Sequence, residues 1–175
     1  MVKKIFWANI FIIVAVLLQS TLLSRLLLFF HVNAVPDVAL CILVFVSYDN
    51  GMMTGQLTGF FSGLFIDFLS SAPLGLNVLV RTLSGALAGL VRGNLILDAV
   101  ILPALFCAGA TLFKALLLFA LNFLFDGATP AYSWTAPTLW VETLLNAALA
   151  PFLFDFLKKF ESLLGKTGGY DENGS

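Results

Sequence analysis

The stretch GMMTGQLTGFFSG, residues 51–63, carries a glycine at every fourth position within a long apolar region. The next apolar run repeats this spacing from Arg81 onward. Residues four apart lie on one face of an α-helix, and small residues there let two membrane helices approach closely. The sequence therefore predicts two helix-packing ridges. They consist of Gly51, Gly55, Gly59 and Gly63 on one helix and of Gly85, Gly89 and Gly93 on the next.

The turn between the two ridges is short and spans residues 70–75. A connection of this length makes the two helices antiparallel neighbours, so the ridges can pack against each other. A second interpretation stays open, in which part of a ridge receives a helix from another protein.

Composition restricts the class of protein. The 175 residues are 60% hydrophobic and 11% charged, whereas a soluble domain is about 45–50% apolar and about 25% charged. This excludes a soluble enzyme, a disordered chain and a nucleic-acid-binding protein that needs a basic patch. Unbroken apolar runs exclude the alternating strands of an outer-membrane barrel. We therefore expect an all-α membrane protein.

The apolar residues fall into six runs, each an expected transmembrane helix. The second run has thirteen residues and would rise about 20 Å, less than the roughly 30 Å hydrocarbon core. It must be re-entrant, be extended by its flanks or lie where the bilayer is thinned. We expect a single membrane domain over residues 1–164 and a polar, disordered tail over 165–175. The runs are 5–30, 36–48, 52–69, 76–95, 99–125 and 137–157.

Basic residues indicate the orientation. Cytoplasmic loops carry an excess of Lys and Arg. Six spans with a cytoplasmic N-terminus leave Arg25 as the one basic residue outside, whereas five spans would move Arg92 and the C-terminal lysines outside as well. We therefore predict six spans with both termini in the cytoplasm. The basic residues on the inner side are then Lys3, Lys4, Arg92, Lys158, Lys159 and Lys166.

The ionisable residues within the expected spans include Asp67, Arg81, Lys114 and Glu142. Each costs about 2.5–3.5 kcal/mol at mid-membrane, so a partner or a function is expected for each. Asp67 continues the first glycine ridge and Arg81 begins the second, at a similar depth. We therefore expect Asp67 and Arg81 to form an intramembrane pair.

Lys114 is the deepest of these residues. It lies about 17 Å from the outer boundary at 1.5 Å per residue, level with Gln19. Its side chain can reach Glu142 or Asn146 by extending outward. We therefore predict a polar pocket formed by Lys114, Glu142, Gln19 and Asn146.

The sequence contains no phosphate-binding loop, dinucleotide fingerprint or catalytic motif. A single histidine and two separated cysteines, Cys41 and Cys107, do not make a metal site. We therefore expect no enzyme activity, no cofactor and no metal.

Several of these segments resemble the MreD family, a small membrane subunit of the bacterial rod-shape-determining machinery. The resemblance rests on Pro36-Asp37 before a short apolar helix, on the glycine-spaced helix that leads to Asp67, and on SSAPLGLN at residues 70–77. Gln19-Ser20-Thr21 in a leucine-rich first span fits as well. The family's basic cluster after the second span is replaced here by Tyr48-Asp49-Asn50.

The resemblance implies a non-enzymatic scaffold in the bacterial cytoplasmic (inner) membrane. MreD-like proteins bind MreC, and act with MreB, RodA and the elongation transpeptidase in lateral peptidoglycan synthesis. The implied fold is similar to the substrate-binding subunits of energy-coupling-factor transporters. The alternative is therefore a small-molecule-binding transporter subunit in which Lys114, Glu142 and Gln19 line an outward pocket. An intramembrane enzyme is disfavoured because no catalytic dyad shares one depth.

Overall fold

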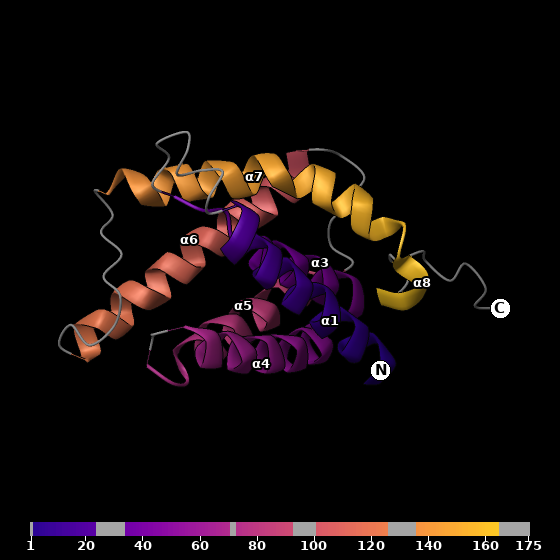
Figure 1. Ribbon diagram of the computed structural model, residues 1–175, viewed down its shortest axis with the longest axis horizontal. Helices are drawn as coiled ribbons and strands as arrows, with labels where there is room; N and C mark the ends of the chain where they lie inside the picture. Colours follow the sequence, from indigo (N-terminus) through magenta and orange to yellow (C-terminus); the bar gives the residue numbers. More distant parts are fainter. Residues whose placement is uncertain (1, 24–33, 71–72, 93–100, 126–135, 165–175) are drawn as a thin grey trace.

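The computed structural model of the chain is built from helices (Figure 1). It describes residues 2–23, 34–70, 73–92, 101–125 and 136–164. No strand occurs within these ranges, which confirms the all-α expectation for this part of the chain. The elements are α1 (Val2–Leu18), the π-helical segment η1 (Gln19–Leu23), α3 (Val38–Asn50), α4 (Met52–Leu69), α5 (Leu76–Leu90), α6 (Ile101–Leu124), α7 (Pro137–Lys158) and the single turn α8 (Glu161–Leu164).

The six longer helices correspond to the six predicted apolar runs. In Figure 1, α7 lies along one side of the molecule and the pair α4 and α5 along the other, with α1 and α3 between them. The start of α1 and the short α8 lie at the same end. Three segments are long and apolar enough to cross a bilayer, Val2–Thr21, Ile101–Leu124 and Pro137–Lys158. The chain is therefore a helical membrane protein; the tail at 165–175 lies outside the described residues.

Helix α3 is the central helix. Eleven of its thirteen residues, Ala39 to Asp49, are buried, and it contacts α1, α4, α5, α6 and α7. A helix that is apolar on all sides is stable when other helices enclose it. Because protein surrounds α3, its short length need not match the thickness of the bilayer.

Helices α4 and α5 pack backbone to backbone along the predicted glycine ridges. A Cβ atom on Gly55 would collide with the carbonyl oxygen of Gly85, and one on Gly59 with the backbone of Arg81. A Cβ on Gly63 would lie 2.6 Å from the carbonyl oxygen of Asn77. No side chain larger than hydrogen fits at these positions, so the described parts of the two ridges fill each other.

The ends of the ridges differ from their middle. A Cβ on Gly89 would lie 2.5 Å from Met52 Cα, so this glycine belongs to the close seam. Gly51 instead forms the turn between α3 and α4, with φ at 92°, a conformation that favours glycine. Gly93 lies outside the described residues. We call the contact of Gly55, Gly59, Gly63, Gly85 and Gly89 the glycine seam.

Candidate functional site

Four buried charged side chains form a continuous chain of ion pairs in the interior. Arg81 Nη2 lies 2.8 Å from Asp37 Oδ1, and Lys114 Nζ lies 2.9 Å from Asp37 Oδ2. Lys114 Nζ also lies 2.8 Å from Glu142 Oε1. The side chains of these residues are 7–17% exposed. We call Arg81, Asp37, Lys114 and Glu142 the ionic chain.

The ionic chain joins four helices. Asp37 is the N-cap of α3, and its Oδ1 also accepts a hydrogen bond from the Leu40 amide at 3.0 Å. Arg81 comes from α5, Lys114 from α6 and Glu142 from α7. Two acids and two bases give the group a net charge of zero. Charges buried at membrane depth are tolerated when they are paired in this way.

The predicted pair of Asp67 and Arg81 is wrong. Arg81 binds Asp37, and the carboxylate of Asp67 accepts hydrogen bonds from the backbone amides of Gly75, Asn77 and Val78 at 2.9, 3.0 and 3.2 Å. These are the free N–H groups at the start of α5, where a carboxylate is favourable. Asp67 lies at the end of α4, next to these donors. It therefore joins the end of α4 to the start of α5 without the help of Arg81.

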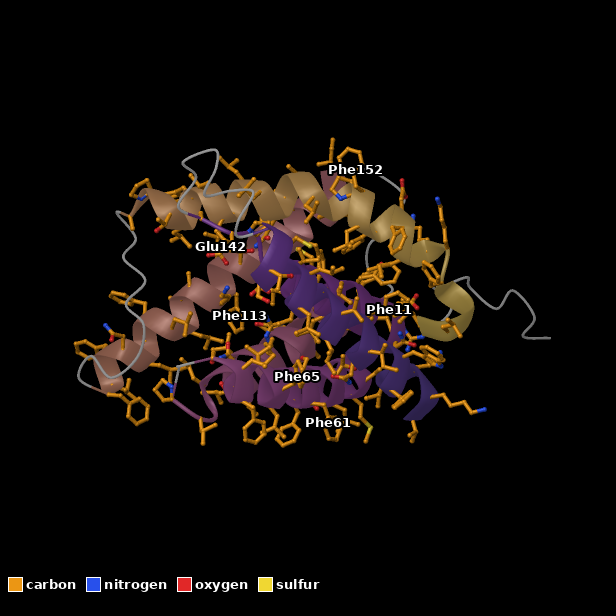
Figure 2. The ribbon with its side chains drawn as sticks, viewed as in Figure 1. Phe11, Phe61, Phe65, Phe113, Glu142 and Phe152 are labelled. Carbon is orange, nitrogen blue, oxygen red and sulfur yellow. The ribbon has the colours of Figure 1, made fainter. Side chains whose placement is uncertain are left out.

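The structure gives each member of the predicted polar pocket a hydrogen-bond partner. Lys114 binds Glu142 directly. Asn146, one turn along α7 from Glu142, donates to Thr111 Oγ1 on α6 at 2.8 Å. Gln19 Oε1 accepts from the amide of Val38, the neighbour of Asp37, at 3.1 Å. Figure 2 shows Glu142 between α7 and α6.

The cavity that Gln19 lines does not include the other three residues. A cavity of about 440 Å³ lies between α1, α3 and α7, and Gln19 is at one end of it. Its other lining residues are apolar, among them Phe11, Ile42 and Phe156. Lys114, Glu142 and Asn146 are not among the residues that line it. The outward pocket with Lys114, Glu142 and Gln19 along one wall is therefore not formed by this cavity.

Sequence reasoning did not select Asp37 as a site residue, because it lies at the very start of the apolar run 36–48. The available signal was its position between Pro36 and Val38, where an acidic residue can cap a helix inside an apolar segment. The charges of Asp67, Arg81, Lys114 and Glu142 already sum to zero. Nothing therefore indicated that a further acid was required.

The C-terminal end of α3 makes a second polar junction, at Asn50, which we call the Asn50 junction. Its side chain accepts from Lys4 Nζ at 3.0 Å and donates to the carbonyl of Leu164 in α8 at 2.7 Å. Arg92 Nη1 donates to the backbone carbonyl of Asn50 at 3.4 Å. Where the family has a basic cluster, this chain therefore has a neutral residue that joins both ends of the described chain to α3.

Over the residues that the structure describes, no group of three or more His, Cys, Asp or Glu is placed to hold a metal ion. The fold and its polar interior together define a class: a helical membrane protein whose core charges join its helices to one another.

The family model for the rod shape-determining protein MreD matches residues 3–160 of this chain. The match covers nearly the whole helical domain, and the chain belongs to the MreD family. No curated protein and no solved structure matches the chain. The similarity to energy-coupling-factor subunits stays a prediction that these comparisons do not support.

Proposed function

We propose that the protein is a non-enzymatic scaffold of the cell-elongation complex in the bacterial cytoplasmic membrane. It binds MreC and, through a larger complex with MreB, RodA and the elongation transpeptidase, supports lateral peptidoglycan synthesis and rod shape. Membership in a family of rod shape-determining membrane proteins is the basis of this proposal.

The ionic chain is the observation that carries the scaffold role. All four of its charged groups bind one another, across four helices. A reaction centre would instead place an acid, base or nucleophile beside a space for substrate, and no member of the ionic chain lines the cavity between α1, α3 and α7. Charges that join helices fix the relative positions of those helices, and a fixed outer surface is what an assembly partner needs.

We further propose six membrane spans with both termini in the cytoplasm. Asn50 brings Lys4 near the N-terminus and Leu164 near the C-terminus to the same end of α3, as an even number of spans requires. Arg92 lies at this junction too, and basic residues favour the cytoplasmic side.

The experiment is co-purification. The full-length protein is expressed with the MreC of its own organism, extracted in mild detergent and captured by an affinity tag. We expect MreC to elute in a defined ratio, and the gene to restore rod shape in cells that lack it. A folded protein that elutes without MreC and does not restore rod shape would contradict the proposal. Co-elution of a transporter ATPase would favour the transporter-subunit alternative.

A further inference from the structure

Gly109 in α6 differs from the glycines of the glycine seam. A Cβ atom added at Gly109 would meet no atom within 4 Å, whereas one added at Gly59 or Gly85 would collide with backbone. Glycine is among the weakest helix formers, so a glycine inside a helix is usually explained by close packing at that position. No contact within the described chain supplies that reason for Gly109.

Gly109 lies in a groove between α5 and α6. The groove has a volume of about 250 Å³. Its small residues are Ser84 and Ala88 on α5 and Gly109 and Ala110 on α6. Larger side chains, including Leu105 and Phe113, complete it, and Figure 2 labels Phe113 on α6. Small residues flanked by larger ones form a surface that a helix backbone can approach closely.

A hydroxyl group in this groove has no hydrogen-bond partner. Ser84 is 2% exposed, and among the described residues its Oγ makes no hydrogen bond. Some other buried hydroxyls bond to the carbonyl four residues earlier, as Ser47 does to Leu43 and Thr143 to Leu139. The buried hydroxyls of two threonines, Thr58 and Thr82, also lack a hydrogen-bond partner among the described residues, but neither threonine lines the groove. A buried hydroxyl without a partner is costly in an apolar setting. Ser84 therefore indicates a missing acceptor at the groove.

We propose that the groove between α5 and α6 receives one transmembrane helix of a partner protein. That helix presents a small residue to Gly109 and a hydrogen-bond acceptor to Ser84. A lipid acyl chain has no acceptor and gains nothing from the absent Cβ. The assignment rests on the proposed scaffold function, and it selects the face that the membrane anchor of MreC contacts.

A second copy of this chain fits the groove less well. The small residues of α4 and α5 are already used in the glycine seam. The exposed side of α7 instead carries Trp140, Leu144, Phe152 and Phe156, which are too large to approach Gly109 closely.

The first test fills the groove. Gly109→Leu extends into open space, so we expect normal folded yield but MreC recovery at background level. The matched control is Ala148→Leu, which places the same leucine side chain at an exposed position of α7 outside the groove and should leave MreC recovery unchanged. Ser84→Ala should fold normally and weaken MreC binding about threefold, as loss of one interhelical hydrogen bond predicts.

The outcomes separate the two proposals. If the wild-type protein captures MreC and the folded Gly109→Leu variant captures it equally well, the groove assignment is wrong and the scaffold function stands. If the wild-type protein itself captures no MreC, the function proposed above fails first.

The second test identifies the occupant and does not depend on a disruptive variant. A photo-crosslinking amino acid is placed at Leu105 in cells that express MreC. A covalent adduct with the MreC transmembrane segment is expected. An adduct with a second copy of the chain, or with lipid only, would overturn the assignment of the partner.

Discussion

The glycine seam and the ionic chain hold helices together in opposite ways. The seam joins two helices that are adjacent in sequence, through backbone contact and with no charge. The ionic chain joins α3, α5, α6 and α7 through the ends of long side chains, over sequence separations of 28 to 77 residues. The seam forms because its glycines have no side chains, whereas the ionic chain needs each of its charged side chains. The comparison predicts that adding atoms breaks the seam and removing atoms breaks the ionic chain.

The largest effect is expected at the centre of the seam. Gly59→Leu places a branched side chain against the backbone of Arg81, and no flexible side chain there can move aside. We expect loss of folded protein, measured by fluorescence-detected size-exclusion chromatography in detergent. Gly109→Leu makes the same change in open space and serves as the control. Equal folded yields of the two variants would show that the close seam is not required.

The next effect is expected at the shared acid of the ionic chain. Asp37→Ala leaves both Arg81 and Lys114 without this partner. Breaking a buried ion pair costs about 3–5 kcal/mol, so we expect a large decrease in the thermal unfolding midpoint in detergent. Adding Arg81→Ala should restore part of the loss, because one unpaired charge is then removed. A double variant less stable than Asp37→Ala would contradict the ion-pair network.

A smaller effect is expected at the turn between α4 and α5. Asp67→Ala removes the acceptor for the first amides of α5, and loss of a helix cap costs about 0.5–2 kcal/mol. Asp67 and Arg81 share no partner. The two single effects should therefore add to within about 0.3–0.5 kcal/mol in the double alanine variant. Strong coupling between them in the same unfolding assay would restore the direct pairing that the sequence suggested.

The smallest effect is expected at the Asn50 junction. Lys4→Ala removes the bond to Asn50, and a partly exposed polar contact of this kind contributes about 0–1 kcal/mol. We expect an unfolding midpoint close to that of the wild type and unchanged rod shape in complementation. A decrease in the unfolding midpoint comparable to that of Asp37→Ala would show that the Asn50 junction, like the ionic chain, is essential to the packing.

The same contrast explains which features the sequence could predict. The glycine spacing repeats along each helix, and the short connection at 70–75 predicts that the two helices are neighbours. The close packing at Gly55, Gly59 and Gly85 could therefore be predicted from the local sequence. The partner of Arg81 could not, because depth along a helix does not say which neighbour faces it. Asp67 was at a suitable depth but lay beside the free amides of α5, and these donors took both of its oxygens.

The position of Lys114 was predicted in part. Its reach toward Glu142 followed from the length of a lysine side chain, and the structure places these two residues in contact. The contact with Asp37 depends on α3 lying at the centre of the bundle. That arrangement is a property of five packed helices, and no local pattern in the run of α3 distinguishes a central helix from a short span.

The central position of α3 has a consequence for how the protein is made. The ribosome completes α3 before α4, α5, α6 and α7, which form most of its enclosure. With thirteen residues, α3 is too short to sit stably across a bilayer as a separate segment when it leaves the insertion machinery. Helix α3 therefore reaches a stable position only after the later helices have been synthesised. Biogenesis of this protein has an obligatory order, in which the centre of the bundle is made early and enclosed last.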